Sequence, residues 1–306
     1  MSRVTLIAGG VGGARLARGL AALAPSVHLT VIVNVGDDDR IYGAHVAADL
    51  DTVTYTLAGI EGPHGWGVAG DTFEVMAALE TLGADTSFRL GDRDLALCLR
   101  RTEMLDEGLL LSTVTAKICT ALGVAPTILP ATDHKLRTRV NTSEAGWLAF
   151  QDYFVRRGNR DEVIGLEYAG SSDARPAPGV VEAIGAADSV FIAPSNPPLS
   201  IHPILAIEEI REAVTAAPRV VAVSPLFGGK ALKGPADRVM ASLGFPAGNA
   251  GVLAAYDRLI SDLVVDLADR TDADTLGDAV SIHSTDTRFA EAEAAARFAR
   301  WLIDLQ

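Results

Sequence analysis

The amino-acid sequence predicts an α/β protein with a Rossmann-like, doubly wound, mostly parallel sheet. A β-branched apolar run, residues 4–8, ends in glycines and continues as an apolar pattern of helical period. A second apolar run, residues 27–33, follows this helix and also ends in a polar loop. The same alternation of strand and helix returns after residue 189. One doubly wound sheet therefore accounts for most of the chain.

The first half of the chain continues as helices and then becomes mixed. Helical patterns follow the second strand, and several begin with Asp, Thr or Ser at the expected cap, at residues 50–57, 71–82, 92–104 and 111–122. Shorter strands are predicted next, with a helical turn at 150–157 between the last two, at residues 127–129, 138–140, 147–150 and 163–168.

The second half returns to strands that alternate with helices. We expect strands at residues 189–193, 219–223, 263–267 and 280–283. A helix begins at about residue 203, and an amphipathic helix closes the chain at 288–305. The sequence contains no internal repeat or evident linker. We therefore predict a single Rossmann-like catalytic domain over residues 1–306, with a possible inserted helical and strand region at about 85–175.

Composition restricts the partners. The 306 residues are 49% hydrophobic, which allows a substantial core. Lysine and arginine number 26 against 39 acidic residues, and a net charge of −13 disfavours nucleic acid and anionic membranes. No apolar run is long enough for a membrane span, and the start lacks a signal-peptide pattern. We therefore expect a cytoplasmic protein, with no nucleic-acid or membrane partner, whose two cysteines stay reduced.

The glycine-rich turn after the first strand is the leading candidate for ligand binding. Gly10, Gly12 and Gly13 open the first helix, whose N-terminus would then attract a phosphate group. Arg15 stands where the third glycine of a dinucleotide fingerprint would lie. Glycines that serve only to pack the helix against the strand remain the alternative.

Carboxylates gather at the predicted ligand edge of the sheet. Asp37 follows the second strand, while Asp49, Asp51 and Asp71 stand at predicted helix starts. Oxygen ligands from separate loops are what Mg²⁺ needs when it also holds substrate phosphates. The alternatives are helix caps for the last three and a solvated turn for Asp37.

Other polar groups follow later strands at the same edge. Lys230 and Lys233 come after a glycine pair and could reach a diphosphate, unless both are simply exposed to solvent. Ser195 and Asn196 could contact a base or ribose, or could form only a proline-fixed turn.

A glycine-rich loop and a helix start offer further candidates. His64 and Trp66 lie on the loop, where the indole could cover a flat ligand or anchor the loop. Arg93 at a helix start opposes the helix dipole, which indicates an anionic or polar target or else a surface ion pair.

Together these motifs resemble the CofD/FbiA family of phospholactate transferases over nearly the whole chain. The matching segments are residues 9–15, 34–38, 49–53, 65–73, 90–96, 151–155, 194–197 and 228–237. The resemblance implies transfer of a phospholactyl or phosphoenolpyruvyl group from a guanosine-diphosphate-linked donor to the ribityl hydroxyl of the deazaflavin Fo. It also implies release of GMP, a place in coenzyme F(420) biosynthesis, and a homodimer.

The resemblance also suggests a role for each candidate residue. Asp37 is expected to be catalytic and to bind Mg²⁺, and Asp51 to be a second ligand or to orient the attacking hydroxyl. The residues expected to contact Fo are Asp51, His64, Trp66, Asp71 and Arg93. Those expected to contact the guanosine diphosphate part are Gly10, Gly12, Gly13, Ser195, Asn196, Lys230 and Lys233.

Two other classes of protein remain open. A nicotinamide-dependent oxidoreductase would explain the first strand and helix, although Asn34 stands where a ribose-binding acid belongs. A nucleotide-sugar-binding regulator of the YvcK type would share the glycines and aspartates but should lack the loop with Trp66 and Asp71. The sequence leaves open whether the donor carries lactate, enolpyruvate or glycerate.

Overall fold

The main sheet has seven parallel strands in a computed structural model that describes residues 1–276 and 280–305. Its strand order is β14-β13-β10-β9-β1-β2-β5. Successive strands run outward in opposite directions from β1 (Ser2–Ala8) and β9 (Ser189–Ile192), so the order reverses between these neighbours. The doubly wound fold expected from the sequence is therefore confirmed, and ligands of such folds bind at this reversal. The other strands are β2 (Val27–Val33), β5 (Thr127–Pro130), β10 (Val220–Val223), β13 (Asp262–Asp266) and β14 (Ser281–Thr285).

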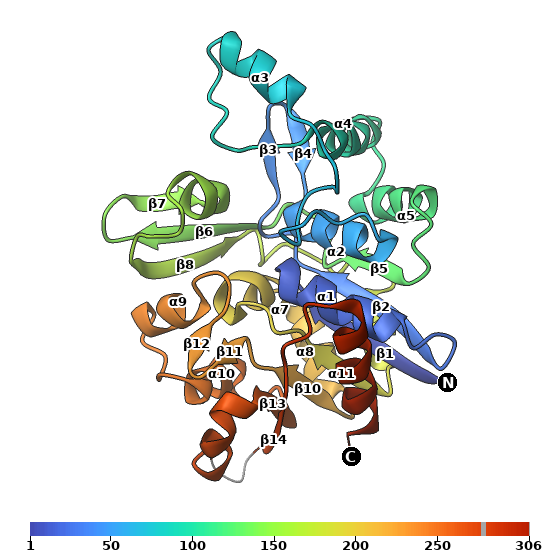
Figure 1. Cartoon of the computed structure of the whole chain (residues 1–306), viewed down its shortest axis with the longest axis vertical. Coiled ribbons are helices and arrows are strands. Elements are labelled where there is room, and N and C mark those ends of the chain that lie inside the picture. Colours follow the sequence, from blue (N-terminus) through green and yellow to red (C-terminus); the bar gives the residue numbers. More distant parts are fainter. Residues whose placement is uncertain (277–279, 306) are drawn as a thin grey trace.

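Helices cover the sheet because its inner strands are buried on both faces, as in other buried parallel sheets. The helices α1 (Gly10–Ala21), α2 (Ala48–Ala58) and α11 (Ala292–Asp304) pack beside one another (Figure 1). Gly19 permits the close approach of α11, since a Cβ there would lie 2.3 Å from the Ala295 carbonyl oxygen. Further helices are α5 (Leu111–Ala121), α6 (Val180–Gly185), α7 (His202–Leu205), α8 (Glu208–Ala216), α9 (Ala236–Ser242) and α10 (Asn249–Tyr256). None of the helices in the described part of the chain combines the length and hydropathy of a membrane span.

Two excursions rise from the carboxyl edge of the sheet (Figure 1). The first holds the hairpin of β3 (Asp39–Ile41) and β4 (Ala44–Val46) with α3 (Glu74–Thr81) and α4 (Asp92–Asp106), around a small core of its own. The second is an antiparallel sheet of β6 (Arg137–Thr142), β7 (Gly146–Ala149) and β8 (Val163–Ala169). A π-helical turn, Asp152–Arg156, follows β7. Small two-residue strands, β11 (Leu226–Phe227) and β12 (Lys230–Ala231), follow β10.

Several predicted boundaries were wrong. The helix expected at 71–82 begins at Glu74, because Asp71 instead caps α4 by accepting the backbone N–H groups of Arg93 and Asp94. Asp92 caps α3 in return, accepting the N–H groups of Glu74 and Val75. The closing helix, expected from 288, begins only at Ala292. The hairpin of β3 and β4 was not predicted at all.

Candidate active site

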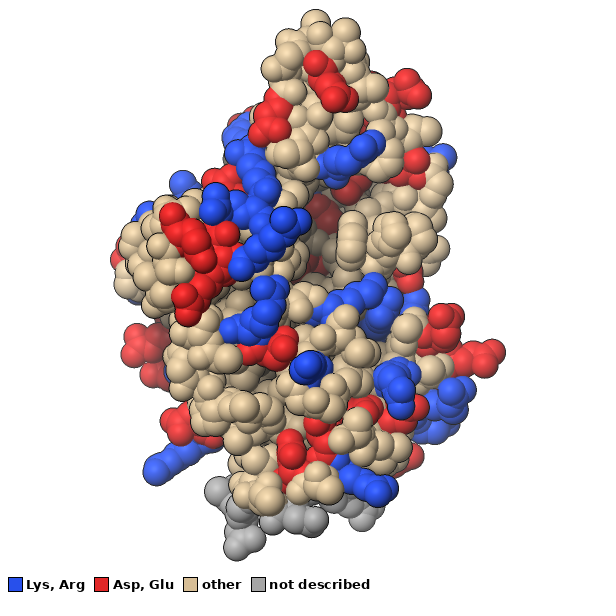
Figure 2. Space-filling model, turned by 60° about the vertical axis from the view of Figure 1, so that its left-hand side comes forward, with Lys and Arg blue, Asp and Glu red and all other residues tan. Residues whose placement is uncertain are grey.

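A cavity of about 880 Å³ lies at the carboxyl edge of the sheet, where the strand order reverses. Figure 2 shows this face of the molecule hollowed, with acidic side chains in its depth and lysine and arginine side chains gathered around its mouth. We call the cations that line the cavity the rim: Arg15, Arg89, Lys233 and Arg288. The acidic residues that line the cavity are Asp37, Asp49, Asp51, Asp94 and Glu291.

Asp37 and Asp49, the sheet-edge pair, are buried carboxylates joined through one amide group. The Asn34 Nδ2 donates to Asp37 Oδ1 over 2.8 Å and to Asp49 Oδ2 over 3.0 Å. Burial raises the pKa of Asp49 to about 6, and burial with the neighbouring charge of Asp49 raises the pKa of Asp37. No lysine, arginine or histidine in the described residues forms an ion pair with either of them. The pair is therefore short of positive charge.

Asp51 and Asp94, the helix pair, have their counter-charge built in. The buried guanidinium of Arg101 binds both carboxylate oxygens of Asp51 and also donates to the His45 carbonyl over 3.0 Å. Asp94 accepts a 2.7 Å hydrogen bond from the Tyr55 hydroxyl. Burial raises the pKa of both carboxylates, to about 6 for Asp94, while Arg101 opposes the rise at Asp51.

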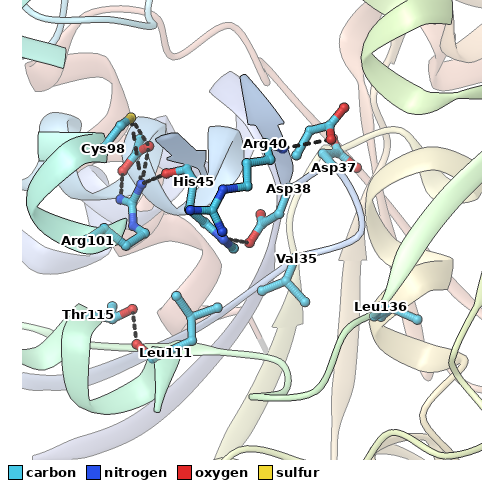
Figure 3. A network of polar contacts seen from close by, with 12 residues as sticks. Val35, Asp37, Asp38, Arg40, His45, Cys98, Arg101, Leu111, Thr115 and Leu136 are labelled. Carbon is cyan, nitrogen blue, oxygen red and sulfur yellow. Dashed lines mark hydrogen bonds and ion pairs between the residues drawn. The ribbon is translucent and has the colours of Figure 1, made fainter. Parts of the chain in front are cut away.

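Cys98 lies next to the helix pair, on α4. Figure 3 shows its thiol beside the guanidinium of Arg101, and the Sγ lies 3.8 Å from Asp94 Oδ1. Ligand atoms of Asp51, Asp94 and Cys98 lie within 4.8 Å of one another. Burial raises the pKa of the Cys98 thiol, and Arg101 already neutralises Asp51, so this cluster is a poor cation site.

The loop that carries Asp37 is held on two sides. Asp38 Oδ2 lies 3.0 Å from the His45 Nε2, and this contact ties the loop to the β3–β4 hairpin. The two side chains face each other in Figure 3. The Gln151 side chain donates to the Asp37 carbonyl over 2.7 Å from the second excursion. Both excursions therefore hold the loop that carries Asp37.

The glycine-rich turn packs closely and already receives an anionic group. The N–H of Gly10, the first of α1, donates to Asp49 Oδ1 over 2.7 Å. A Cβ at Gly12 would lie 2.5 Å from the Pro194 carbonyl, and one at Gly13 would lie 2.8 Å from the Ala8 side chain. The packing role is thus evident, while Gly10 and Gly12 still line the cavity.

Ser195 and Asn196 differ in whether their side chains have a hydrogen-bond donor available for a ligand. The Ser195 hydroxyl donates to the Gly9 carbonyl over 2.6 Å and so joins the ends of β1 and β9. Asn196 uses its Oδ1 to accept the N–H of Leu199, but its Nδ2 is buried and has no partner among the described residues. Both residues line the cavity, and Asn196 has the spare donor.

Of the two lysines, only Lys233 reaches the cavity wall. Its Nζ lies 5.8 Å from the Trp66 ring centroid and donates to the His64 carbonyl. Lys230 is exposed in β12, and the Gly228 N–H beside it is donated to Asp269. Trp66 lines the cavity with 57% of its surface exposed. His64, with its ring 5.6 Å from that of Trp66, is not part of the lining.

Three more predicted residues lie outside the lining. Gly13 is buried against Ala8, Asp71 caps α4, and the exposed Arg93 donates to the Ala69 carbonyl over 3.3 Å. The sequence analysis did not identify Asp94 of the helix pair or Arg101, which neutralises Asp51. Their spacing with Cys98, at 94, 98 and 101, places all three on one helix face and could have revealed them.

Comparisons with known proteins identify the family of this chain. A family model described as 2-phospho-L-lactate transferase CofD matches residues 4–296. A phosphoenolpyruvate transferase of Kitasatospora aureofaciens is 44% identical over 275 residues, covering 87% of this chain and 86% of the relative. A 2-phospho-L-lactate transferase of Methanopyrus kandleri is 40% identical over 303 residues, covering 98% and 96%.

A solved structure supports the fold alone. A UPF0052-family protein of Bacillus halodurans has a TM-score of 0.68 over 99% of both chains, at 17% identity. The family match and the two relatives, in contrast, extend over most of the sequence. The chain is therefore an enzyme, a transferase, and it belongs to the CofD family of 2-phospho-L-lactate transferases.

Proposed function

We propose that this enzyme transfers a phospholactyl or phosphoenolpyruvyl group from a guanosine-diphosphate-linked donor to the ribityl hydroxyl of Fo. The product is coenzyme F(420)-0 or its dehydro form, and GMP is released. The observation that carries the proposal is the charge layout of one cavity, in which buried carboxylates lie at the depth and cations line the rim. Such a layout suits a polyanionic donor that enters between the rim and a cation held in the depth.

The transfer itself needs positioning more than covalent help. The hydroxyl oxygen of Fo forms a bond to the phosphorus that carries the lactyl or enolpyruvyl group. The bond from this phosphorus to the oxygen bridging the two phosphates breaks, so GMP leaves with that electron pair. The hydroxyl proton passes to a nearby base, for which the carboxylates that line the cavity are the candidates.

The sheet-edge pair fits a magnesium ion. Asp37 and Asp49 are hard oxygen ligands that share one Asn34 amide and form no ion pair among the described residues. Mg²⁺ there would neutralise the phosphate oxygens of the donor and of the leaving GMP. Asp51, the second ligand expected from the sequence, is the alternative to Asp49, although Arg101 already occupies its oxygens.

The wall around the helix pair is our proposed binding site for Fo. Tyr55, Trp66 and Phe88 offer flat apolar surfaces for a deazaflavin, and Asp51 and Asp94 offer acceptors for its ribityl hydroxyls. The guanosine diphosphate part would then lie along the glycine turn, Asn196 and Lys233. Arg93 and Asp71 would act on Fo only indirectly, through the loop and the helix that they hold.

Mass spectrometry of product formation tests the proposal. Purified protein, Fo and Mg²⁺ are mixed separately with the synthetic lactyl, enolpyruvyl and glyceryl donors. We expect GMP and one F(420)-0 product in equal amounts, and the donor that reacts fastest identifies the acyl group. Reactions without Fo give the background of donor hydrolysis. Binding of nucleotide sugars without any turnover would instead favour the regulator class.

The remaining expectations have tests of their own. We propose a homodimer of the cytoplasm, with no nucleic acid or membrane as partner. Light scattering after size-exclusion chromatography measures the mass in solution, and a mass of one chain, 32.0 kDa, would contradict the dimer.

A further inference from the structure

Arg15 is a cation of the cavity wall that the internal contacts of the protein leave unused. It lies on α1 one turn after Gly12, and both residues line the cavity because residues three apart share a helix face. Its side chain is partly buried, yet none of the described residues forms a hydrogen bond or an ion pair with it. A guanidinium that lines a cavity and has no partner in the protein is available to bind an anionic ligand there.

The next arginine of the same helix, Arg18, is held by contacts within the protein. Arg18, one further turn along α1, forms an ion pair with Glu61 and donates to the Ala290 carbonyl over 2.6 Å. Glu61 is thereby occupied, and Glu291 is not paired with Arg15 in the described part of the chain. Burial, together with the neighbouring charge of Arg18, lowers the pKa of Arg15. Arg18 is therefore paired within the protein, whereas the guanidinium of Arg15 forms no ion pair among the described residues.

The glycine turn does not offer its first backbone amide to a phosphate, so a nearby cation is needed to bind one. The first amide of α1, on Gly10, is donated to Asp49, so the part of the helix N-terminus best placed for a phosphate holds a carboxylate. Arg15 lies in the second turn of the same helix and lines the cavity together with Gly10 and Gly12. Arg288 lines the same cavity and adds a second positive charge to it.

We propose that Arg15 binds an anionic oxygen group of the donor, either a phosphate of its diphosphate or the carboxylate of its lactyl or enolpyruvyl part. This inference rests on the proposed function, because it takes the donor class from there. A guanidinium fork matches both groups, and it can make two parallel hydrogen bonds to either. Arg15 would then be a binding residue that draws the donor toward the sheet-edge pair.

Calorimetric titration and kinetics with Arg15→Gln test this assignment. GDP carries the diphosphate without the acyl carboxylate, so it separates the two sources of the anion. If Arg15 binds phosphate, we expect the Kd for GDP to rise roughly 10- to 100-fold, as for loss of a charge-assisted contact. If Arg15 binds the carboxylate, the Kd for GDP stays within about twofold and the KM for the full donor rises by a similar factor.

Matched variants keep the result interpretable. Arg300→Gln removes one equal charge from an exposed position on α11, and should leave both constants unchanged. Arg15→Lys keeps the charge but loses the fork, so it should weaken the same ligand by about 3- to 10-fold even if the glutamine variant fails to fold. Constants within twofold of the parent protein for every Arg15 variant and both ligands would overturn the assignment.

The controls also separate this inference from the proposed function. If the parent protein turns over the donor while the Arg15 variants match it, only the role of Arg15 is wrong. If the parent protein binds neither GDP nor the donor, the donor class itself is wrong and the assignment fails with it.

Discussion

The sheet-edge pair and the helix pair place buried carboxylates on one cavity but neutralise them differently. Asp51 of the helix pair has the guanidinium of Arg101, itself only 3% exposed, on both of its oxygens. Asp37 and Asp49 of the sheet-edge pair have only the neutral amide of Asn34 between them. Buried carboxylates without a counter-charge are unfavourable. The difference leaves the sheet-edge pair, rather than the helix pair, without a counter-charge, and this is why we propose the sheet-edge pair as the cation site.

Loss of the built-in cation should give the largest effect. Arg101→Met leaves Asp51 buried and unpaired, and removing one partner of such a pair costs about 3–5 kcal/mol of unfolding free energy. Urea unfolding measures this loss. The double variant Asp51→Asn with Arg101→Met should recover part of it, because the unpaired charge is gone. A stability of the single variant equal to that of the parent would show that Arg101 does not neutralise the helix pair.

Loss of a sheet-edge carboxylate should instead act on catalysis. Asp37→Asn keeps the size of the side chain but removes a hard ligand, so turnover should fall at least ~10²-fold with a small change in stability. Mass-spectrometric rates at saturating Mg²⁺ give the effect, and unfolding curves give the control. Full turnover of the parent protein in excess chelator would break the link between this pair and a metal.

Variants of Lys230 and Lys233 test whether the donor binds on the side of the cavity that carries the sheet-edge pair. Lys233→Ala should raise the Kd for GDP by roughly 3- to 10-fold, because Lys233 lines the cavity. Lys230→Ala serves as the matched variant, since Lys230 is exposed outside that lining. Calorimetry that finds the larger loss for Lys230 would restore its predicted diphosphate contact and contradict the placement of the donor.

Trp66 tests the assignment of Fo to the side of the helix pair, with the smallest energy at stake. Stacking on the deazaflavin would contribute about 0.5–1.5 kcal/mol beyond area burial. Trp147 and Trp301 are first replaced by Phe, so that emission reports Trp66 alone. Fo should quench this emission. A variant that makes product while its emission ignores Fo would identify the Trp66 loop as structural.

The sequence predicted the fold well because its signals are local. Most strands of the main sheet are short apolar runs, and glycine, proline or short polar residues follow their carboxyl ends. The first excursion was harder, because β3 and β4 form a two-stranded hairpin whose small core depends on α3 and α4, far along the chain. The helix caps were missed for the same reason, because they depend on residues distant in the sequence. Asp71 caps α4, and Asp92 caps α3.

The site was predicted in part for the same reason. Asp37, Trp66, Asn196 and Lys233 line the cavity, as expected from their positions after strands or on glycine-rich loops, and so does Asp51, which was expected at a helix start. Which carboxylate has a counter-charge could not be inferred locally, because Arg101 lies 50 residues from Asp51. The pairing of Asp49 with Gly10 likewise spans 39 residues, so the loop could not be recognised as already carrying an anionic group.

Magnesium titration by calorimetry tests the central claim most directly. The parent protein is compared with Asp49→Asn and Asp51→Asn, which remove one charge from each pair at nearly constant size. We predict that Mg²⁺ binds the parent and Asp51→Asn with similar affinity, and that Asp49→Asn weakens binding at least ~10-fold. Unchanged binding by Asp49→Asn together with its loss in Asp51→Asn would contradict the account and assign the metal to the helix pair.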